Sequence, residues 1–527
     1  MTLLTPANPP GERRLPVFLL FFGTLFFWAC GGARPADRSA DRCDDGGMDW
    51  TPEIQSEIEK QLVLQSSDWP GGSVEQIMGR LEKVASAGRK SLRALCEDAR
   101  NETLPPASIQ GMRGCMEVAM EMPQVLVSQI VKGELAPPEN ILFLLEGAQL
   151  RLHACGFETT YGQYTDFEIN DAKAQGFHAL FRAEALALLK QSGQAATHLD
   201  LARAAAKRAN AGSLSAEVLL QQAWLQMTNE KFEAAATVAR DARNTADSVH
   251  DVKRMVMAEY TESIAYMNLQ ELEAAMELQY AALHRHLSLP QTPFDFNTPY
   301  LRTVDVLYML TREYGRAVAL EETIISEYTK VLGDESILVA WTHNFLGSNH
   351  RNLNQYIRAI SEYTEALRQF DALLGPNSRP AGMIYSTLES LYFEMDDTVQ
   401  GIRMGEAALQ AKLKRDDVKD AEIIGDYLHL AQQYASAKMA DDALRLYDAA
   451  LERQLAGPGP KDAQTQKTLA AINALCDGGL IRACETIQQH QDVMSQAPDT
   501  PDTPDTPDTP DTPDTMPDTD AVTPRDF

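Results

Sequence analysis

Small and apolar positions recur along this chain at a long and nearly constant period. One small residue returns in steps of 40, 40, 42, 42, 42 and 42 residues. Its seven copies are Ala195, Ala235, Ala275, Ala317, Ala359, Gly401 and Ala443. A period held over about half the chain predicts stacked repeats, because each repeat buries its apolar face only against its neighbours.

Three further series keep a fixed offset from these anchors. The series twelve residues before the anchor is mostly small: Ala183, Ala223, Ser263, Asp305, Gly347, Glu389 and Ala431. The series nine residues before it is large: Leu186, Gln226, Tyr266, Tyr308, His350, Tyr392 and Tyr434. The series seven residues after it is Ala202, Ala242, Ala282, Ile324, Ala366, Ala408 and Ala450. Each repeat is therefore predicted to be a pair of antiparallel helices that approach closely at the small residues, with the large residue filling the space beside the turn.

This pattern resembles the tetratricopeptide repeat, and residues 328–347 resemble the 42-residue repeats of kinesin light chains. The resemblance covers residues 176–456 and departs from the usual types at Asp305, Ile324, Glu389 and Gly401. It implies an all-α fold, a right-handed α-solenoid of about seven helical hairpins that presents a surface for partners.

A second helical block is predicted ahead of the repeats, over residues 48–175. Apolar residues follow helical spacing at Ile77, Leu81, Val84, Leu92 and Leu95, and again from Met112 to Ile130. Together with the cysteines, Arg89 and the segments 93–96 (RALC), 113–115 (RGC) and 153–155 (HAC) resemble the extracytoplasmic region of myxobacterial-type serine/threonine kinases. The chain has no Gly-rich phosphate loop, His-Arg-Asp or Asp-Phe-Gly, so the resemblance implies a sensor region without a kinase domain.

The amino terminus has the pattern of an export signal. Arg13 and Arg14 precede an apolar run from Leu15 to Ala29, which is shorter than the roughly 20 residues that span a bilayer. Ala29 before Cys30 resembles a bacterial lipoprotein box, although Trp28 is bulkier than that box prefers. The expectation is a signal peptide over 1–29, a lipid on Cys30 and a linker over 30–47, in the bacterial cell envelope; an uncleaved anchor and a simple cleaved signal are the alternatives.

Six further cysteines fit an oxidising compartment. Cys96 and Cys115 flank a turn signal, Leu104-Pro105-Pro106, and are predicted to pair. Cys476 and Cys484 flank Asp477-Gly478-Gly479 and are also predicted to pair, within capping helices over 457–494. Cys43 and Cys155 are the two cysteines left over, and a bond between them is the residual pairing. Beyond them, Pro-Asp-Thr triplets make 495–527 an extended, disordered tail.

Charge and motifs limit the chemistry. The net charge of −28 argues against nucleic acid as a partner, since no basic field would neutralise phosphates. No hydrolase, zinc-protease or phosphate-loop motif occurs, and no cofactor or metal is expected. The paired carboxylates Glu321-Glu322, Asp396-Asp397 and Asp416-Asp417, and the pair His284 and His286, are interpreted as solvated side chains.

The remaining prediction is a groove for a protein or peptide. Counting back from each anchor places exposed positions on the first helices, an apolar floor followed by an Asn/Arg section. The partner-binding candidates are Trp224, Met227, Tyr260, Met267, Arg302, Trp341, Asn344, Ser348 and Arg351. The preferred function is a non-catalytic, envelope-anchored interaction scaffold or sensor partner; the alternative is an exported enzyme with its site in block 48–175.

Overall fold

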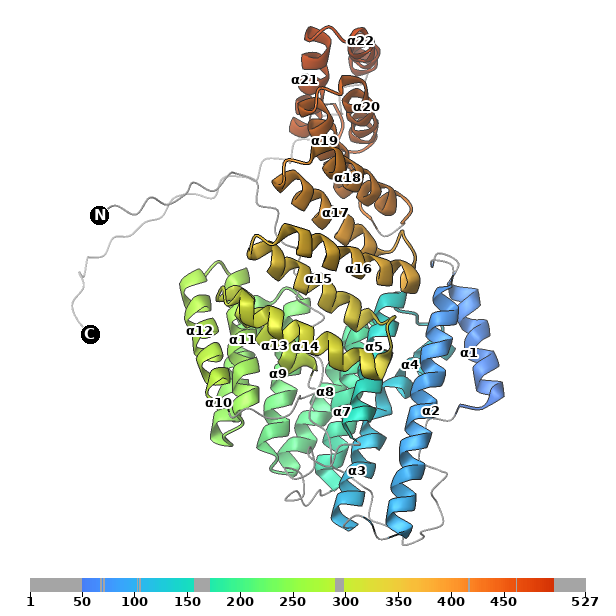
Figure 1. Ribbon diagram of the computed structural model, residues 1–527, viewed down its shortest axis with the longest axis vertical. Helices are drawn as coiled ribbons and strands as arrows, with labels where there is room; N and C mark the ends of the chain where they lie inside the picture. Colours follow the sequence, from blue (N-terminus) through green and yellow to red (C-terminus); the bar gives the residue numbers. More distant parts are fainter. Residues whose placement is uncertain are drawn as a thin grey trace, which may run out of the picture. The chain divides into compact units, whose positions relative to one another are not determined.

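A computed structural model describes residues 50–496 except 67–68, 70–71, 102, 104–105, 156–170, 290–297, 416–417 and 461, and the described residues are helical apart from caps and turns (Figure 1). The predicted lipid site Cys30, the linker and the tail from 497 onward lie outside these residues. Within the described ranges, every helix is too short or too polar to span a bilayer. The chain forms two compact units that divide between Asp426 and Tyr427.

Five helices form the amino-terminal block of the first unit. They are α1 (Pro52–Gln65), α2 (Ser73–Arg100), α3 (Pro106–Ala119), α4 (Glu121–Lys132) and α5 (Pro138–Ala154). Thr51 caps α1 by accepting a hydrogen bond from the backbone of Ile54, and Gly133 ends α4 in the left-handed conformation. Helix α5 is buried along nearly its whole length, because other helices cover it on several sides.

Six helical hairpins follow in the first unit, and the seventh leads into the second unit. The hairpins are α7 (Asp171–Leu188) with α8 (Ser192–Arg208), α9 (Gly212–Thr228) with α10 (Phe232–Ser248), α11 (Val252–Asn268) with α12 (Leu272–Leu287), α13 (Thr298–Leu310) with α14 (Tyr314–Leu332), α15 (Ile337–Asn352) with α16 (Tyr356–Leu374), α17 (Arg379–Glu394) with α18 (Thr398–Leu413), and α19 (Asp420–Ser436) with α20 (Ala440–Ala456). Each of the seven anchors is the fourth residue of a second helix, and all are buried. The predicted α-solenoid of tetratricopeptide-like hairpins is confirmed.

One turn geometry joins the two helices of every hairpin. The residue five positions before each anchor has a positive φ, and the next residue donates its backbone N–H to the carbonyl of the large residue nine before the anchor. This is the six-to-one bond of a Schellman motif, which satisfies a free carbonyl at the end of the first helix. The positive-φ residues are Lys190, Glu230, Gln270, Arg312, Asn354, Asp396 and Lys438.

The two repeat lengths correspond to two kinds of connection between hairpins. The 40-residue steps use the same left-handed turn again, at Asn210 (φ 50°) and His250 (φ 55°). Two of the 42-residue steps use a slightly longer loop in which Gly333 (φ 88°) or Gly375 (φ 82°) ends the helix. The hydroxyl of Ser336 or Ser378 then caps the next helix.

The amino-terminal block packs against repeats that lie far away in sequence. Helix α5 contacts α7 and also α14 and α15 (Figure 1). The fully buried carboxylate of Glu146 on α5 accepts hydrogen bonds from Ser336 Oγ (2.6 Å) and from the backbone N–H groups of Ile337 and Leu338 (3.1 Å each). An anion at the start of α15 is favourable because the first N–H groups of a helix have no partner within it.

Arg80 completes this contact from helix α2. Its guanidinium lies 3.1 Å from Glu146 Oε1 and donates to the carbonyl oxygens of Leu332 (2.9 Å) and Glu335. Gln149 adds a hydrogen bond to the carbonyl of Val331 (2.8 Å). We call Arg80, Glu146, Gln149 and the segment 331–338 the seam, because they join the amino-terminal block to the start of α15.

The disulfide predicted between Cys96 and Cys115 is wrong. Cys115 on α3 pairs with Cys155 at the end of α5, with 5.7 Å between their Cα atoms, and this also excludes the residual pairing of Cys155 with Cys43. Cys96 is disulfide-bonded too, but not to Cys115. It lies four residues before the end of α2, whereas Cys115 lies nine residues after the start of α3. That offset of five residues displaces them by about 7 Å along antiparallel helices, beyond the reach of a disulfide.

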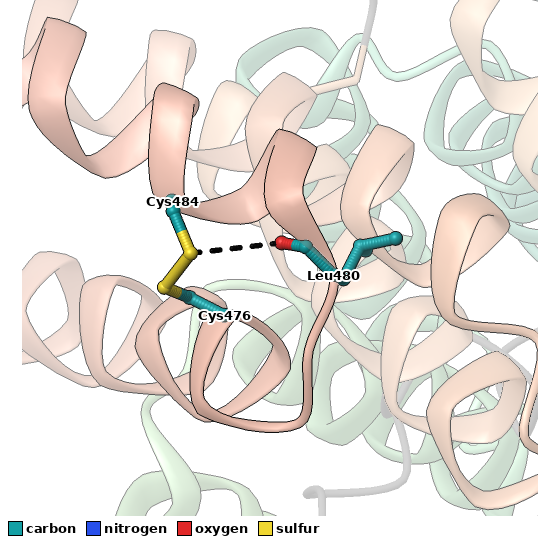
Figure 2. Close-up of a disulfide and its surroundings, with 3 residues drawn as sticks. All are labelled: Cys476, Leu480 and Cys484. Atoms are coloured by element: carbon teal, nitrogen blue, oxygen red, sulfur yellow. Dashed lines mark hydrogen bonds between the residues drawn. A yellow bond between two sulfur atoms is a disulfide. The ribbon is translucent and has the colours of Figure 1, made fainter.

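The second unit contains α20, α21 (Ala463–Asp477) and α22 (Ile481–Gln496). The predicted bond between Cys476 and Cys484 is confirmed and joins α21 to α22 across a tight turn (Figure 2). Gly479 takes a φ of 95° in that turn. Cys484 Sγ lies 3.8 Å from the carbonyl oxygen of Leu480, a contact rather than a hydrogen bond, since an oxidised sulfur carries no proton.

Candidate functional site

The first helices of the repeats form the inner wall of the solenoid in the first unit. Successive first helices from α7 to α13 contact one another, α5 of the amino-terminal block contacts α7, and α15 contacts α5 at the seam. Side chains that point from one first helix toward the next are therefore enclosed by neighbours. Any binding surface on this wall depends on which side chains the closure leaves exposed.

Buried charges link several of these helices. Arg151 on α5 pairs with Glu184 on α7 (3.1 Å), and Arg254 on α11 pairs with Glu217 on α9 (2.9 Å). Burial raises the pKa of Glu184 to about 8 and lowers the pKa of Arg151 to about 10, so desolvation outweighs the attraction within that pair. Each pair joins two neighbouring helices, and removing one partner would leave the other charge buried alone. We therefore interpret these residues as structural contacts between the helices.

Five predicted groove residues are buried. Exposure is at most 8% for Trp224, Met227, Tyr260, Trp341 and Asn344. The ring of Trp224 lies 6.4 Å from that of Tyr260 on the next first helix, and Trp341 packs edge-on against Phe370 at 5.0 Å. The prediction that these positions are exposed is wrong, because neighbouring helices of the solenoid pack directly over them.

Four predicted groove residues remain partly exposed, namely Met267, Arg302, Ser348 and Arg351. The guanidinium of Arg302 donates to Asp305 Oδ2 (2.6 Å) and lies 3.9 Å from the ring centre of Phe345 on α15. Ser348 is hydrogen-bonded to the hydroxyl of Tyr363 (3.0 Å).

Arg351 has a partner on the next first helix. Its Nε donates to Glu394 Oε2 on α17 at 2.9 Å, and a second hydrogen bond joins its Nη2 to Glu394 Oε1. These hydrogen bonds raise the pKa of Arg351. The side chains are 28% and 44% exposed, so the pair is accessible to solvent and its energetic contribution is modest.

An accessible row continues from Arg351 along α17, beyond the repeats that α5 covers. Met383, Ser386, Ser390 and Phe393 follow one another at helical spacing; Ser390 is exposed and the others are half-buried. These four positions lie 18, 15, 11 and 8 residues before the anchor Gly401, just as Ser348 and Arg351 lie 11 and 8 residues before the anchor Ala359. We define the inner row as Ser348, Arg351, Met383, Ser386, Ser390 and Phe393. It combines two apolar side chains, three hydroxyls and one ion pair to Glu394.

A buried carboxyl pair was missed by the sequence interpretation. Glu321 was interpreted as solvated, but it is fully buried, and so is Asp305, which occupies the slot of a small residue on α13. Asn349 on α15 donates to Glu321 Oε2 (3.0 Å). Burial raises the pKa of both carboxyls, and the adjacent Asp305 raises that of Glu321 further, so the pair holds a proton where isolated carboxyls are ionised.

This pair predicts a pH dependence of stability. The folded-state pKa of Glu321 lies above its unfolded value of about 4.3, so the folded chain binds more protons. The contribution of the pair is fully present below that pH and is lost as the pH rises through the folded-state pKa. Glu321→Gln has an amide that can donate to Asp305. In urea titrations the variant is expected to unfold at a higher urea concentration than the unmodified chain at pH 9, but not at pH 4. Glu322→Gln, at the exposed neighbouring position, is the control. If the free energy of unfolding changes with pH equally in the two variants, the raised pKa of Glu321 is contradicted.

The histidines were also misplaced in part. His284 is exposed, as interpreted, but His286 is half-buried between two tyrosines. Its Nδ1 lies 2.8 Å from the hydroxyl of Tyr300, and its Nε2 lies 3.2 Å from that of Tyr308. Burial, with Arg316 and Lys253 nearby, lowers the pKa of His286, so it is a neutral packing residue near pH 7.

Comparisons with known proteins extend to folds only. No family model matches the chain, and no curated protein matches it. Among solved structures, BtubC (BKLC) from P. vanneervenii is 24% identical, with 44% of this chain and 92% of that chain covered and a TM-score of 0.34. NprR in complex with its cognate peptide NprX is 14% identical over 63% of this chain and 95% of that chain, with a TM-score of 0.32. The human IFIT1 dimer with m7Gppp-AAAA is 11% identical over 84% and 92%, with a TM-score of 0.39.

Proposed function

We propose that this chain is a non-catalytic interaction scaffold of the bacterial envelope that binds a protein or peptide along the inner row. The observation that carries the proposal is that α15 and α17 keep accessible, chemically mixed side chains, whereas most of the corresponding positions on α9, α11 and α13 are buried. Met383 and Phe393 offer apolar contacts, and the serines between them can pair with a peptide backbone.

The ion pair at one end of the row suits a charged partner. Glu394 holds the guanidinium of Arg351 in a fixed orientation while leaving part of it accessible to solvent. A carboxylate of a partner could share that guanidinium, and a basic side chain could share Glu394. The row therefore fits an extended segment with apolar side chains and at least one charge.

The envelope location is part of the same proposal. It rests on the export signal and on Ala29-Cys30, and the bonds Cys115–Cys155 and Cys476–Cys484 support it because disulfides persist in oxidising compartments. The resemblance of RALC, RGC and HAC to kinase sensor regions suggests that the partner belongs to a signalling assembly at the membrane.

Blocking the row should weaken binding without unfolding the chain. Ser390→Arg places a long charged side chain on an exposed position of α17, and it is expected to reduce recovery of a partner from detergent-solubilised envelopes at least about tenfold, or 1.4 kcal/mol. Ser326→Arg, on an exposed position of α14, is the matched control. Equal recovery with both baits would remove the inner row from the binding surface.

The proposed lipid on Cys30 has a separate test. Cys30→Ser is expected to leave the protein as an unprocessed precursor without lipid, because the thiol is the acylated group in a lipoprotein signal. Mass spectrometry of the membrane fraction would distinguish the forms. A processed, membrane-bound protein of mature length in the variant would refute acylation at this residue.

A further inference from the structure

Helix α12 carries an exposed apolar stripe on the outer side of its hairpin. Leu272, Met276, Tyr280 and Leu287 are 58%, 53%, 55% and 48% exposed. At 100° per residue these four positions fall within a sector of about 80°, so they lie on one face of the helix. Leu283 in the same sector is buried and separates Leu287 from the other three. The stripe runs the length of the helix, about 22 Å from Leu272 to Leu287.

No other second helix in the described part of the chain presents such a stripe. Helices α8, α16 and α18 each expose one large apolar side chain, Leu201, Ile357 and Val399 respectively, and α10 and α14 expose none. The anchor Ala275 and the inward Ala282 of α12 are buried as in the other repeats, so the hairpin is packed normally. The stripe is therefore additional to what the solenoid needs, and contiguous apolar surface of this kind marks interaction sites.

Acidic side chains border the stripe along one edge. Glu273 and Glu277 are exposed, they follow Leu272 and Met276 by one residue each, and neither forms an ion pair with a described residue. Exposed His284 continues this edge toward the end of the helix. On the other side of α12, Arg285 is already bound by Glu259 (2.8 Å). The free charge beside the stripe is thus negative.

We propose that the α12 stripe binds a cationic amphipathic helix of a partner protein, with the apolar face on Leu272, Met276 and Tyr280 and basic side chains on Glu273 and Glu277. A helix of about four turns matches the length of the stripe, and the pairing of an apolar seam with opposite charges at its edge is how helices select partners. The net charge of −28 disfavours a second copy of this chain, and the two carboxylates disfavour an anionic lipid surface. This surface lies on a second helix, so it is separate from the inner row.

The test uses a fluorescent 18-residue peptide of leucine and lysine with a helical apolar face, titrated against the full chain by anisotropy. Met276→Ser with Tyr280→Ser is expected to weaken binding at least about tenfold, and Glu273→Gln with Glu277→Gln to weaken it and reduce its salt dependence. Ile357→Ser with Val399→Ser removes exposed apolar groups from other second helices and should leave the affinity unchanged.

Three results would overturn the proposal. One is equal affinity of all variants, which would mean that the peptide binds acidic surface elsewhere. Another is equal binding of a leucine/glutamate peptide, which would remove the role of charge. The last is a dimer of the unmodified chain in light scattering that Met276→Ser with Tyr280→Ser dissociates, which would make a second copy the occupant.

Discussion

Glu146→Ala is expected to lower the free energy of unfolding of the first unit by about 3–5 kcal/mol, the cost of leaving a buried charge without its partner. The substitution removes the acceptor for Ser336 and for two backbone N–H groups, and it leaves the guanidinium of Arg80 at 4% exposure without a carboxylate. Urea unfolding would give the loss, and hydrogen exchange over residues 331–346 would show whether the seam opens first.

Two controls separate the seam from general effects of the substitution. Glu146→Gln keeps an acceptor for the backbone of α15 but not the charge facing Arg80, so an intermediate loss is expected. Glu322→Ala removes an exposed carboxylate from α14 and should change stability by less than about 0.5 kcal/mol. If Glu146→Ala costs no more than Glu322→Ala, the block is not held to the repeats by this carboxylate.

Cys115→Ser with Cys155→Ser is expected to cost about 4 kcal/mol. The bond closes a loop of 40 residues, and the chain-entropy model assigns the unfolded state that much restriction. Cys476→Ser with Cys484→Ser opens a loop of 8 residues and should cost about 2.5 kcal/mol, in the second unit only. Calorimetry of the two variants provides the comparison. A larger effect for the shorter loop would contradict the entropic account.

The repeat architecture could be predicted from local features. The anchors and the large residues nine positions earlier mark the buried start of the second helix and the carbonyl acceptor of each turn. Gly347 illustrates the rule, since a Cβ there would lie 2.8 Å from the ring of Tyr363. These constraints act between the two helices of one hairpin, so one repeat is enough to express them.

Exposure along the groove could not be predicted in the same way. Counting from an anchor fixes the helix face of Trp224 or Trp341, but burial depends on what packs over that face. The next first helix covers Trp224, and Trp341 lies in the repeat that the seam joins to α5 through contacts 190 to 255 residues apart. Glu146 gave one signal of this, as a lone charge in an apolar run from Ile141 to Leu150. Such a charge in a buried helix requires a partner.

The misread carboxylate has a local explanation. Glu321 lies four residues after Ala317 and three before Ile324, on the buried stripe of α14, whereas Glu322 lies off that stripe. Helical periodicity would have separated the two, but treating them as a solvated pair hid the difference. The prediction that Cys96 pairs with Cys115 was wrong for a similar reason. A turn between the two residues brings their helices together, but the thiols lie at different levels along the helix axes.

The most direct test of the binding surface is photo-crosslinking in living cells with a benzoyl-phenylalanine at Ser390. A discrete crosslinked partner is expected from Ser390 and none from Ser326, because only Ser390 belongs to the inner row. No adduct at Ser390, or the same adduct from both positions, would contradict the proposal that α15 and α17 form the binding surface.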